Sequence, residues 1–186
     1  MLEARDIACQ RAGRIPFAPL SFTLCPGEAL LVTGANGSGK TSLLRLLAGL
    51  LPGEGSLNRP EPVVYLGHRD GLKRELSVSD NLSFWRALWN DRHELDAALA
   101  LFGIAPLKER KVQSLSAGQR KRVDLSRLAL CAAPLILLDE PNEHLDDEGV
   151  FQLVRLLEEL RGRQSILVVA AHGHLPLAFS ARVALS

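Results

Sequence analysis

The feature that most limits what this chain can fold into is a glycine-rich loop, Gly34-Ala35-Asn36-Gly37-Ser38-Gly39-Lys40-Thr41. It fills every fixed position of the pattern GxxxxGK[ST], after an apolar run at 29–32 and before a leucine-rich helical run from Ser42 to Leu51. Glycines let successive backbone N–H groups close around an anion, and the following helix N-terminus adds positive partial charge. We therefore predict a nucleotide site in which Lys40 contacts the β- and γ-phosphates and Thr41 binds Mg²⁺. The alternative is a glycine-rich surface turn.

Length and charge restrict the class of protein further. With 186 residues, 47% of them hydrophobic, the chain is expected to form one globular domain with a substantial core. Its 22 basic residues nearly balance its 21 acidic residues, for a net charge of +1. Composition therefore gives no reason to expect a nucleic acid or an anionic membrane surface as partner.

Cysteine usage and hydropathy indicate the compartment. Cys9, Cys25 and Cys131 are scattered and show no CxxC spacing, which argues against a disulfide framework or a structural zinc site. No basic and apolar leader opens the chain, and no apolar run is long enough to cross a bilayer. We expect a cytoplasmic protein that docks on something that spans the membrane.

Apolar runs predict strands at 29–32, 63–66, 135–138 and 166–169, and weaker patterns predict strands at 1–9 and 20–24. The first four alternate with helical segments, which favours a parallel sheet with right-handed crossovers. The other two favour a small antiparallel flap beside it. The stretch from Gly53 to Pro62 is polar and rich in Gly and Pro, so it is interpreted as a connection.

Helical periodicity predicts a helical insert at about 76–131 within a single domain at 1–186. Ser77 and Asp80 form a capping-box pattern before a helix that begins near Val78, and further helices are expected at 94–103, 120–131 and 146–161. The fold class is therefore α/β, with a parallel sheet core, an antiparallel β flap and a helical insert.

Polar residues follow two of the predicted core strands. Asp139 and Glu140 come directly after 135–138, and His172 follows 166–169. Beside a phosphate loop, Asp139 is expected to hold Mg²⁺, Glu140 to polarise the attacking water, and His172 to donate a hydrogen bond to the γ-phosphate. Their order along the chain favours nucleotide hydrolysis over a scaffold that only binds nucleotide.

A second phosphate-binding pattern lies in the segment Leu115-Ser116-Ala117-Gly118-Gln119. Ser116 and Gly118 stand at the N-terminus of a predicted helix, where an anion is favoured. One chain then carries two half-sites for phosphate. This suggests that two copies face each other, each offering one half-site to the ATP held by the other.

These motifs resemble those of a known family. The phosphate loop, LSAGQ at 115–119, LLDEP at 137–141, Leu145-Asp146 and a histidine at a strand end occur here in the order seen in the ATP-binding subunits of ABC transporters. The resemblance implies the P-loop NTPase core of the ABC ATPase fold. It also implies a head-to-tail dimer in which each of two ATP molecules lies between the phosphate loop of one copy and residues 115–119, the signature segment, of the other. Glu140 would be the catalytic base and His172 the switch histidine. Asp146 would lie in the loop that crosses the dimer.

A narrower resemblance concerns segments that line a surface. Residues 65–68 (YLGH), 71–73 (GLK), 81–85 (NLSFW) and 115–123 (LSAGQRKRV) are similar to those of the haem-exporting ATP-binding subunits of cytochrome c maturation systems. This implies integral membrane transporter subunits as partners and a peripheral position on the cytoplasmic face of the inner membrane. Trp85, Trp89 and the loop after Arg69 are then candidates for contacting the membrane subunit. For the two tryptophans, core packing is the alternative.

Some positions depart from the ABC pattern. Arg69 stands where a glutamine is expected, and Ala117 replaces a glycine of the signature segment. Instead of an aromatic residue for stacking on adenine, the chain has Arg11 and Arg14, with Phe17 as the nearest ring. Either arginine lies over the base or both are plain surface residues.

Two further histidines are alternatives at the site. His144 follows a predicted turn rather than a strand end, so His172 is preferred as the switch residue. His174 forms an HxH pair with His172, a pattern that also suits a metal but lacks a third ligand nearby.

The sequence therefore predicts a Mg-dependent ATPase coupled to transport, whose biological role is haem handling for c-type cytochromes. One alternative is an ABC subunit for another substrate. A second is a soluble ABC-type ATPase of DNA repair or translation, although the chain has no coiled-coil insert and no duplicated cassette. A third is a nucleotide sensor in which Arg69 has disabled turnover.

Overall fold

The computed structural model describes residues 1–9, 16–89 and 94–185. The chain divides into two compact units, which are described separately. The first comprises residues 1–68, 133–141 and 157–186, and the second comprises residues 69–132 and 142–156. Within the described ranges, every helix is too short or too polar to cross a membrane.

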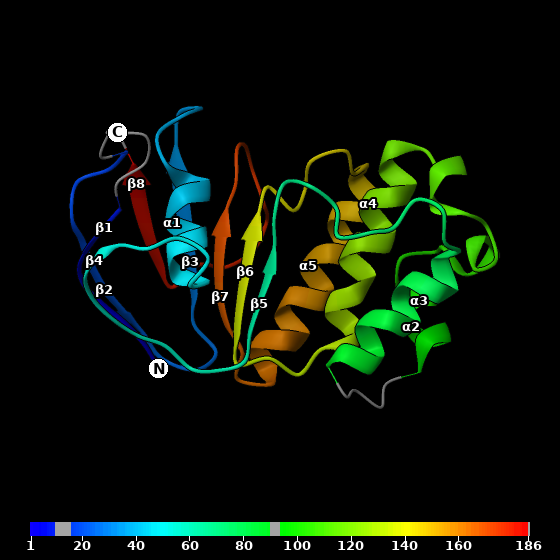
Figure 1. Cartoon of the computed structure of the whole chain (residues 1–186), viewed down its shortest axis with the longest axis horizontal. Helices are drawn as coiled ribbons and strands as arrows, with labels where there is room; N and C mark the ends of the chain where they lie inside the picture. The colour runs from blue at the N-terminus through cyan, green and yellow to red at the C-terminus, as the bar shows by residue number, and fades with distance from the viewer. Residues whose placement is uncertain (10–15, 90–93, 186) are drawn as a thin grey trace. The chain divides into compact units, whose positions relative to one another are not determined.

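The first unit contains the predicted parallel sheet (Figure 1). Its strand order is β5-β6-β7-β3-β8, with β5 at Val63–Leu66, β6 at Leu135–Asp139, β7 at Ile166–Ala170, β3 at Ala29–Gly34 and β8 at Ala181–Leu185. Every residue of β6 and β7 is buried, as expected for central parallel strands covered on both faces. Strands β3, β6 and β7 therefore end at the same edge, and that edge carries the polar residues of interest.

A small antiparallel sheet completes this unit. Its order is β2-β1-β4, with β2 at Leu20–Leu24, β1 at Leu2–Ala8 and β4 at Glu54–Asn58. The flap predicted from the first two strands is confirmed. The third strand was missed, because 53–62 was interpreted as a connection. Four of the five residues of β4 are exposed, so β4 carries no apolar alternation and is held by pairing with β1.

Helix α1 spans Lys40–Leu47 and lies between the two sheets (Figure 1). Its leucines join side chains of β1, β3, β6 and β7 in one buried cluster, so the predicted leucine face is core. The helix ends four residues before the predicted Leu51. Gly49 follows with a φ of 73°, a left-handed conformation that stops a helix at little cost in glycine.

Strand β8 was also absent from the sequence prediction, which placed the last clear strand at 166–169. Its residues are partly exposed at every position but the last, and it is identified by its pairing with β3. The other predicted core strands are confirmed. β5 has the expected bounds, β6 and β7 are each one residue longer than expected, and β3 is two residues longer.

The second unit is helical. It holds α2 at Val78–Leu88, α3 at Leu95–Leu101, α4 at Ala117–Ser126, the first turns of α5 at Asp147–Gly162, and short 3-10 turns at 105–107, 112–114 and 127–130. The single helix expected at 120–131 is wrong in its bounds. Ser116 caps α4, which begins three residues earlier than expected, and from Arg127 the chain continues as a 3-10 turn.

A buried ion pair stands at the centre of this helical unit. Asp124 and Arg127 are both at most 4% exposed and bond to each other, and the Arg127 guanidinium lies 3.7 Å from the centroid of the Trp85 ring. The N–H of Gly71 donates to Asp124, and the Trp85 indole N–H donates to the carbonyl of Gly71. The loop after Arg69 is thereby fixed to α2 and α4.

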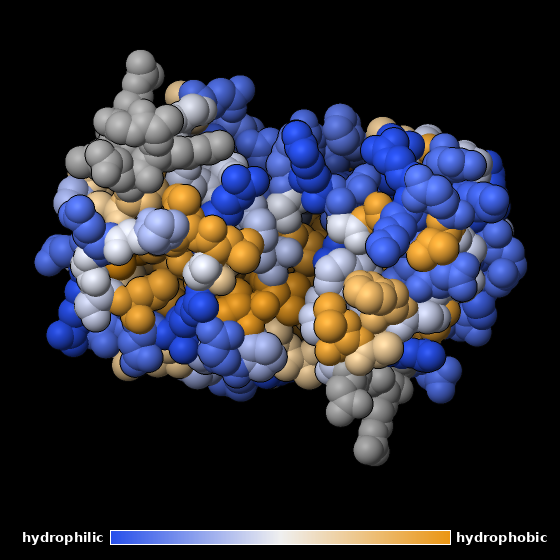
Figure 2. Space-filling view, viewed as in Figure 1, coloured by the Kyte–Doolittle hydropathy of each residue, from blue (hydrophilic) through white to orange (hydrophobic). Residues whose placement is uncertain are grey.

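Apolar side chains remain at the surface of α2. Phe84 is 55% exposed and Leu88 is 59% exposed, while Trp85 and Trp89 are partly buried. Figure 2 shows apolar residues gathered at the surface over the end of this helix. The sequence offered membrane-subunit contact and core packing as alternatives for the two tryptophans. In the structure one helix presents apolar surface and also packs inward.

Candidate functional site

The phosphate loop joins β3 to α1 in the first unit. Gly34, Gly37 and Gly39 all have positive φ, so the backbone turns through conformations that other residues rarely adopt. A Cβ atom at Gly34 would lie 2.4 Å from the Ser38 hydroxyl, and one at Gly39 would lie 2.8 Å from the Phe17 ring. The glycines are therefore required for the loop's shape. The loop delivers the chain directly into the N-terminus of α1, where an anion is favoured.

The side chain of Lys40 folds back over the loop that precedes it. Its Nζ atom lies 2.9 Å from the carbonyl oxygen of Gly34, 3.2 Å from that of Ala35 and 2.7 Å from Nε2 of His172. The ammonium group of this largely buried residue is thus held where the phosphate loop and the end of β7 meet.

Oxygen ligands suited to a hard cation lie next to this lysine. The Thr41 hydroxyl donates to Oδ2 of Asp139 at 2.7 Å, which brings the first turn of α1 to the end of β6. Hydroxyl and carboxylate oxygens are the ligands that Mg²⁺ prefers. The Ser38 hydroxyl is buried in the loop and has no hydrogen-bond partner among the described residues. These groups fit a phosphate accompanied by Mg²⁺.

Glu140 and His172 lie at the ends of neighbouring strands. Glu140 has a φ of 52°, and its N–H donates to the carbonyl oxygen of Ala170 at 2.8 Å. A left-handed conformation is uncommon for glutamate, and such strain is typical of functional sites. The carboxylate oxygen Oε1 lies 3.5 Å from Nε2 of His172. The residues predicted from three separate motifs therefore gather at one edge of the sheet.

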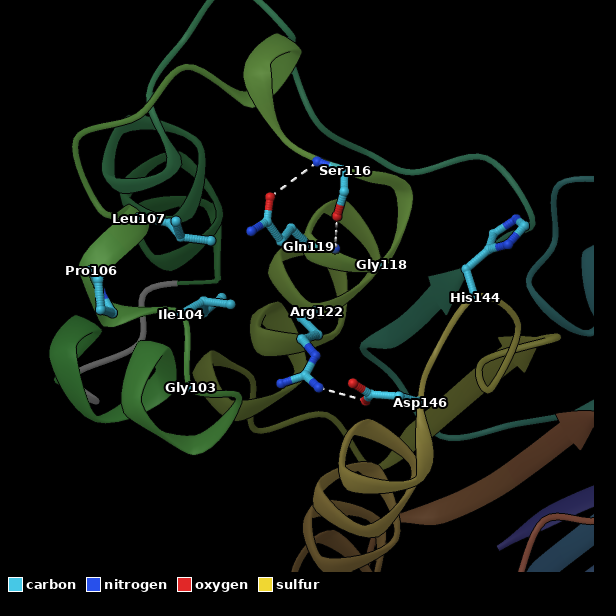
Figure 3. A pocket seen from close by; sticks show the side chains of 10 residues that line it. All are labelled: Gly103, Ile104, Pro106, Leu107, Ser116, Gly118, Gln119, Arg122, His144 and Asp146. Carbon is cyan, nitrogen blue, oxygen red and sulfur yellow. Dashed lines mark hydrogen bonds and ion pairs between the residues drawn. The ribbon is translucent and has the colours of Figure 1, made fainter.

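A second group of predicted residues meets in the helical unit. Ser116 caps α4: its hydroxyl accepts from the N–H of Gln119, and its own N–H donates to the Gln119 side chain. A cavity of about 380 Å³ opens beside this cap (Figure 3). It is lined by Gly103, Ile104, Pro106, Leu107, Ser116, Gly118, Gln119, Arg122, His144 and Asp146.

Asp146 stands on the far side of this cavity from Ser116, before the first turn of α5 (Figure 3). Its carboxylate accepts from the N–H of Gly149 at 2.9 Å and from Arg122 at 2.5 Å. These two partners hold the pKa of Asp146 below its ordinary value, the Gly149 N–H having the larger effect. Sequence reasoning missed Arg122, because its partner lies 24 residues further along the chain.

Other predicted residues stand differently. Arg69 is exposed. His144 lies in the second unit and lines the cavity, whereas His172 contacts Lys40. Phe17 is 3% exposed and packs into the core, so little of its ring is left for a base. The hypothesis that Arg11 or Arg14 lies over adenine concerns residues outside the described part of the chain.

The fold and these two groups of residues define a P-loop ATPase domain of the ABC class. A family model described as ABC transporter matches residues 17–143. The cytochrome c biogenesis ATP-binding export protein CcmA of Rhodopseudomonas palustris (strain BisB18) is 43% identical over 97% of this chain and 95% of its own length. The protein of the same name from Xanthomonas campestris pv. campestris (strain 8004) is 45% identical over 93% and 87%. The chain belongs to the ABC transporter family and, within it, to the group of CcmA proteins.

Solved structures agree with this fold. An ATP-binding protein of a candidate ABC transporter from Pyrococcus furiosus superposes with a TM-score of 0.86 at 23% identity, covering 99% of this chain and 96% of that one. A dimeric post-hydrolysis state of an ATP-binding cassette bound to ADP and Pi gives 0.80 at 18% identity, covering 93% and 88%. The predicted ABC ATPase fold is confirmed. Membership of the ABC transporter family makes the chain an ATPase whose hydrolysis is coupled to transport.

Proposed function

We propose that this chain hydrolyses Mg-ATP as the motor subunit of an exporter for c-type cytochrome biogenesis, with haem handling as its service. The relatives that cover nearly the whole chain are named cytochrome c biogenesis ATP-binding export proteins. The observation that carries the catalytic part is the meeting of Lys40, Glu140 and His172 at the end of the parallel sheet. Each comes from a different motif, and together they suit ATP hydrolysis.

In this proposal, the loop from Gly34 to Ser42 wraps the phosphates of ATP. Lys40 contacts the β- and γ-phosphates through Nζ. Thr41 and Asp139 would hold Mg²⁺, directly or through water, and the bound ion would supply positive charge beside the phosphate oxygens. The 2.7 Å hydrogen bond between these two residues supports the assignment, because it brings the Thr41 hydroxyl and the Asp139 carboxylate close enough to bind one ion.

Glu140 is the general base that accepts a proton from the attacking water. His172 orients that water and donates a hydrogen bond to the γ-phosphate as charge builds there. The 3.5 Å separation of Glu140 Oε1 from His172 Nε2 supports a shared task for the two side chains. Hydrolysis then cleaves the bond between the β,γ-bridging oxygen and the γ-phosphorus, and releases ADP and phosphate.

Two copies are needed for a complete site. The cavity in the second unit is lined by Ser116, Gly118, Gln119 and Asp146, and no residue of the phosphate loop lines it. We propose that they contact the ATP bound by the facing copy in a head-to-tail dimer, so that two ATP molecules lie between the two chains. The fold shared with a dimeric ATP-binding cassette is consistent with this arrangement.

The partners are integral membrane subunits, which place the chain on the cytoplasmic face of the inner membrane. The surface that supports this is the exposed apolar face of α2, with Phe84 and Leu88 beside Trp85 and Trp89. Such a patch is typical of protein contact rather than of free solvent exposure. In this proposal, the membrane-spanning segments of the exporter belong to the partner subunits. The described helices of this chain do not span a bilayer.

Covalent haem staining of c-type cytochromes directly tests the proposed role in cytochrome c biogenesis. A strain lacking the gene is complemented with the natural chain, with Glu140→Gln, or with Glu159→Gln as an exposed control on α5. We expect staining to be lost on deletion and restored by the natural chain and Glu159→Gln only. Staining that persists in the deletion strain would overturn the cytochrome c assignment. Restoration by Glu140→Gln would show that ATP turnover is not required.

A further inference from the structure

Arg122 is the side chain that joins the separate elements of the second half-site. It lies on the second turn of α4 and is 18% exposed. Its Nη1 atom donates to the carbonyl oxygen of Phe102, at the end of α3, at 3.0 Å and to Oε1 of Gln152, in α5, at 3.4 Å. Its Nη2 atom donates to Oδ1 of Asp146 at 2.5 Å. One planar group therefore connects the end of α3, the body of α4 and the start of α5.

Asp146, which Arg122 holds, is fixed in orientation but remains accessible to a partner. The Asp146 side chain is 69% exposed, yet the same oxygen that accepts from Arg122 also accepts from the Gly149 N–H. A carboxylate with two donors on one oxygen has little rotational freedom, and most of this side chain remains exposed. This geometry presents an acceptor to a partner and is more than is needed to cap a helix.

Arg122 also fixes the other wall of the cavity. The capping box of Ser116 and Gln119 belongs to the same α4, less than two turns before Arg122. A helix is stiff over that length, so whatever holds Arg122 sets the position of the Ser116 cap relative to Asp146. In Figure 3 Ser116 and Asp146 stand on two sides of the cavity, with Arg122 between them.

We infer that Arg122 is a positioning residue that holds Ser116 and Asp146 in the one arrangement that can engage ATP on the facing copy. This inference rests on the proposed function, because it assumes that the half-site acts across a dimer. Arg122 touches no reacting atom in this account. Its role is served by the guanidinium fork, which reaches one acceptor at the end of α3 and two at the start of α5, a geometry that a lysine ammonium does not reproduce.

The test compares Arg122→Gln and Arg122→Lys with Lys108→Gln. Lys108 forms an ion pair with Asp96 in the same unit, outside the cavity lining, and is a matched control for loss of one cation. For Arg122→Gln we expect kcat to fall about tenfold, the factor that corresponds to losing about 1.4 kcal/mol from a charge-assisted hydrogen bond. Arg122→Lys keeps the charge beside Asp146 and is expected to lie between the two.

Nucleotide affinity separates positioning from general structural damage. We expect Arg122→Gln to bind a fluorescent Mg-ATP analogue as tightly as the natural chain, because the phosphate loop belongs to the other unit. In a Glu140→Gln background, it should need more Mg-ATP to dimerise. A kcat equal to that of Lys108→Gln, or a matched loss of nucleotide affinity, would overturn the inference while the proposed function stands. A natural chain without ATP turnover would overturn both.

Discussion

The Nζ atom of Lys40 lies 2.7 Å from Nε2 of His172, although the two residues are 132 positions apart in the chain. A lysine ammonium only donates hydrogen bonds, so Nε2 of His172 is the acceptor in this contact. A γ-phosphate that binds Lys40 competes for the same ammonium. When phosphate takes that bond, His172 is released to interact with the phosphate itself. In the proposed mechanism, binding of ATP and alignment of His172 are thus linked through Nζ of Lys40.

The first prediction concerns this histidine. His172→Ala should lower kcat about a hundredfold, the usual cost of removing one donor that stabilises transition-state charge. Its affinity for Mg-ATP should stay the same or increase, because the competing acceptor for Lys40 is gone. Phosphate release at saturating ATP and nucleotide titration measure the two quantities. His174→Ala, in the same exposed loop, is the control, and equal turnover in both variants would contradict the assignment.

The second prediction concerns the metal ligands. Thr41→Val keeps the shape of the side chain but removes the hydroxyl that meets Asp139. We expect it to shift half-maximal turnover to a higher Mg²⁺ concentration, by about tenfold for the loss of one ligand or its supporting bond. Thr33→Val on β3, which removes a hydroxyl bonded to the Val183 carbonyl, is the matched control. An unchanged Mg²⁺ titration for Thr41→Val would remove Thr41 from the metal site.

The third prediction concerns stability of the helical unit. Burial raises the pKa of the Asp124 carboxyl, while Arg127 and the N–H of Gly71 oppose that rise. Asp124→Ala leaves the Arg127 charge buried without its partner and should lower the free energy of unfolding by about 3–5 kcal/mol. Asp124→Leu combined with Arg127→Met should recover much of that loss. Urea denaturation followed by tryptophan fluorescence checks both, and equal losses in single and double variants would argue against a strong pair.

Much of the site was predictable because it is encoded locally. A phosphate loop needs glycines and a lysine within eight residues, and Asp139 and Glu140 directly follow an apolar strand. Parallel strands then bring their carboxyl ends to one edge without further information. The same reasoning found His172 but placed no contact between it and Lys40, since such a contact depends on strand order rather than on spacing.

The strands and the arginine that were not predicted from the sequence share a physical cause. Strands β4 and β8 are partly exposed edges stabilised by pairing with β1 and β3, so neither shows the apolar pattern of a core strand. Arg122 was one of several arginines after the signature segment, and its partners come from two other elements. Such tertiary hydrogen bonds leave no periodicity in the sequence.

The most direct test of the account is the mass of Glu140→Gln in solution with and without Mg-ATP, measured by light scattering after gel filtration. Replacing the base should stop hydrolysis while leaving both half-sites intact. We predict a monomer without nucleotide and a stable dimer with two ATP per dimer when Mg-ATP is present, whereas Lys40→Ala in the same background should stay monomeric. A monomer under both conditions would contradict the claim that two copies of this chain share their ATP.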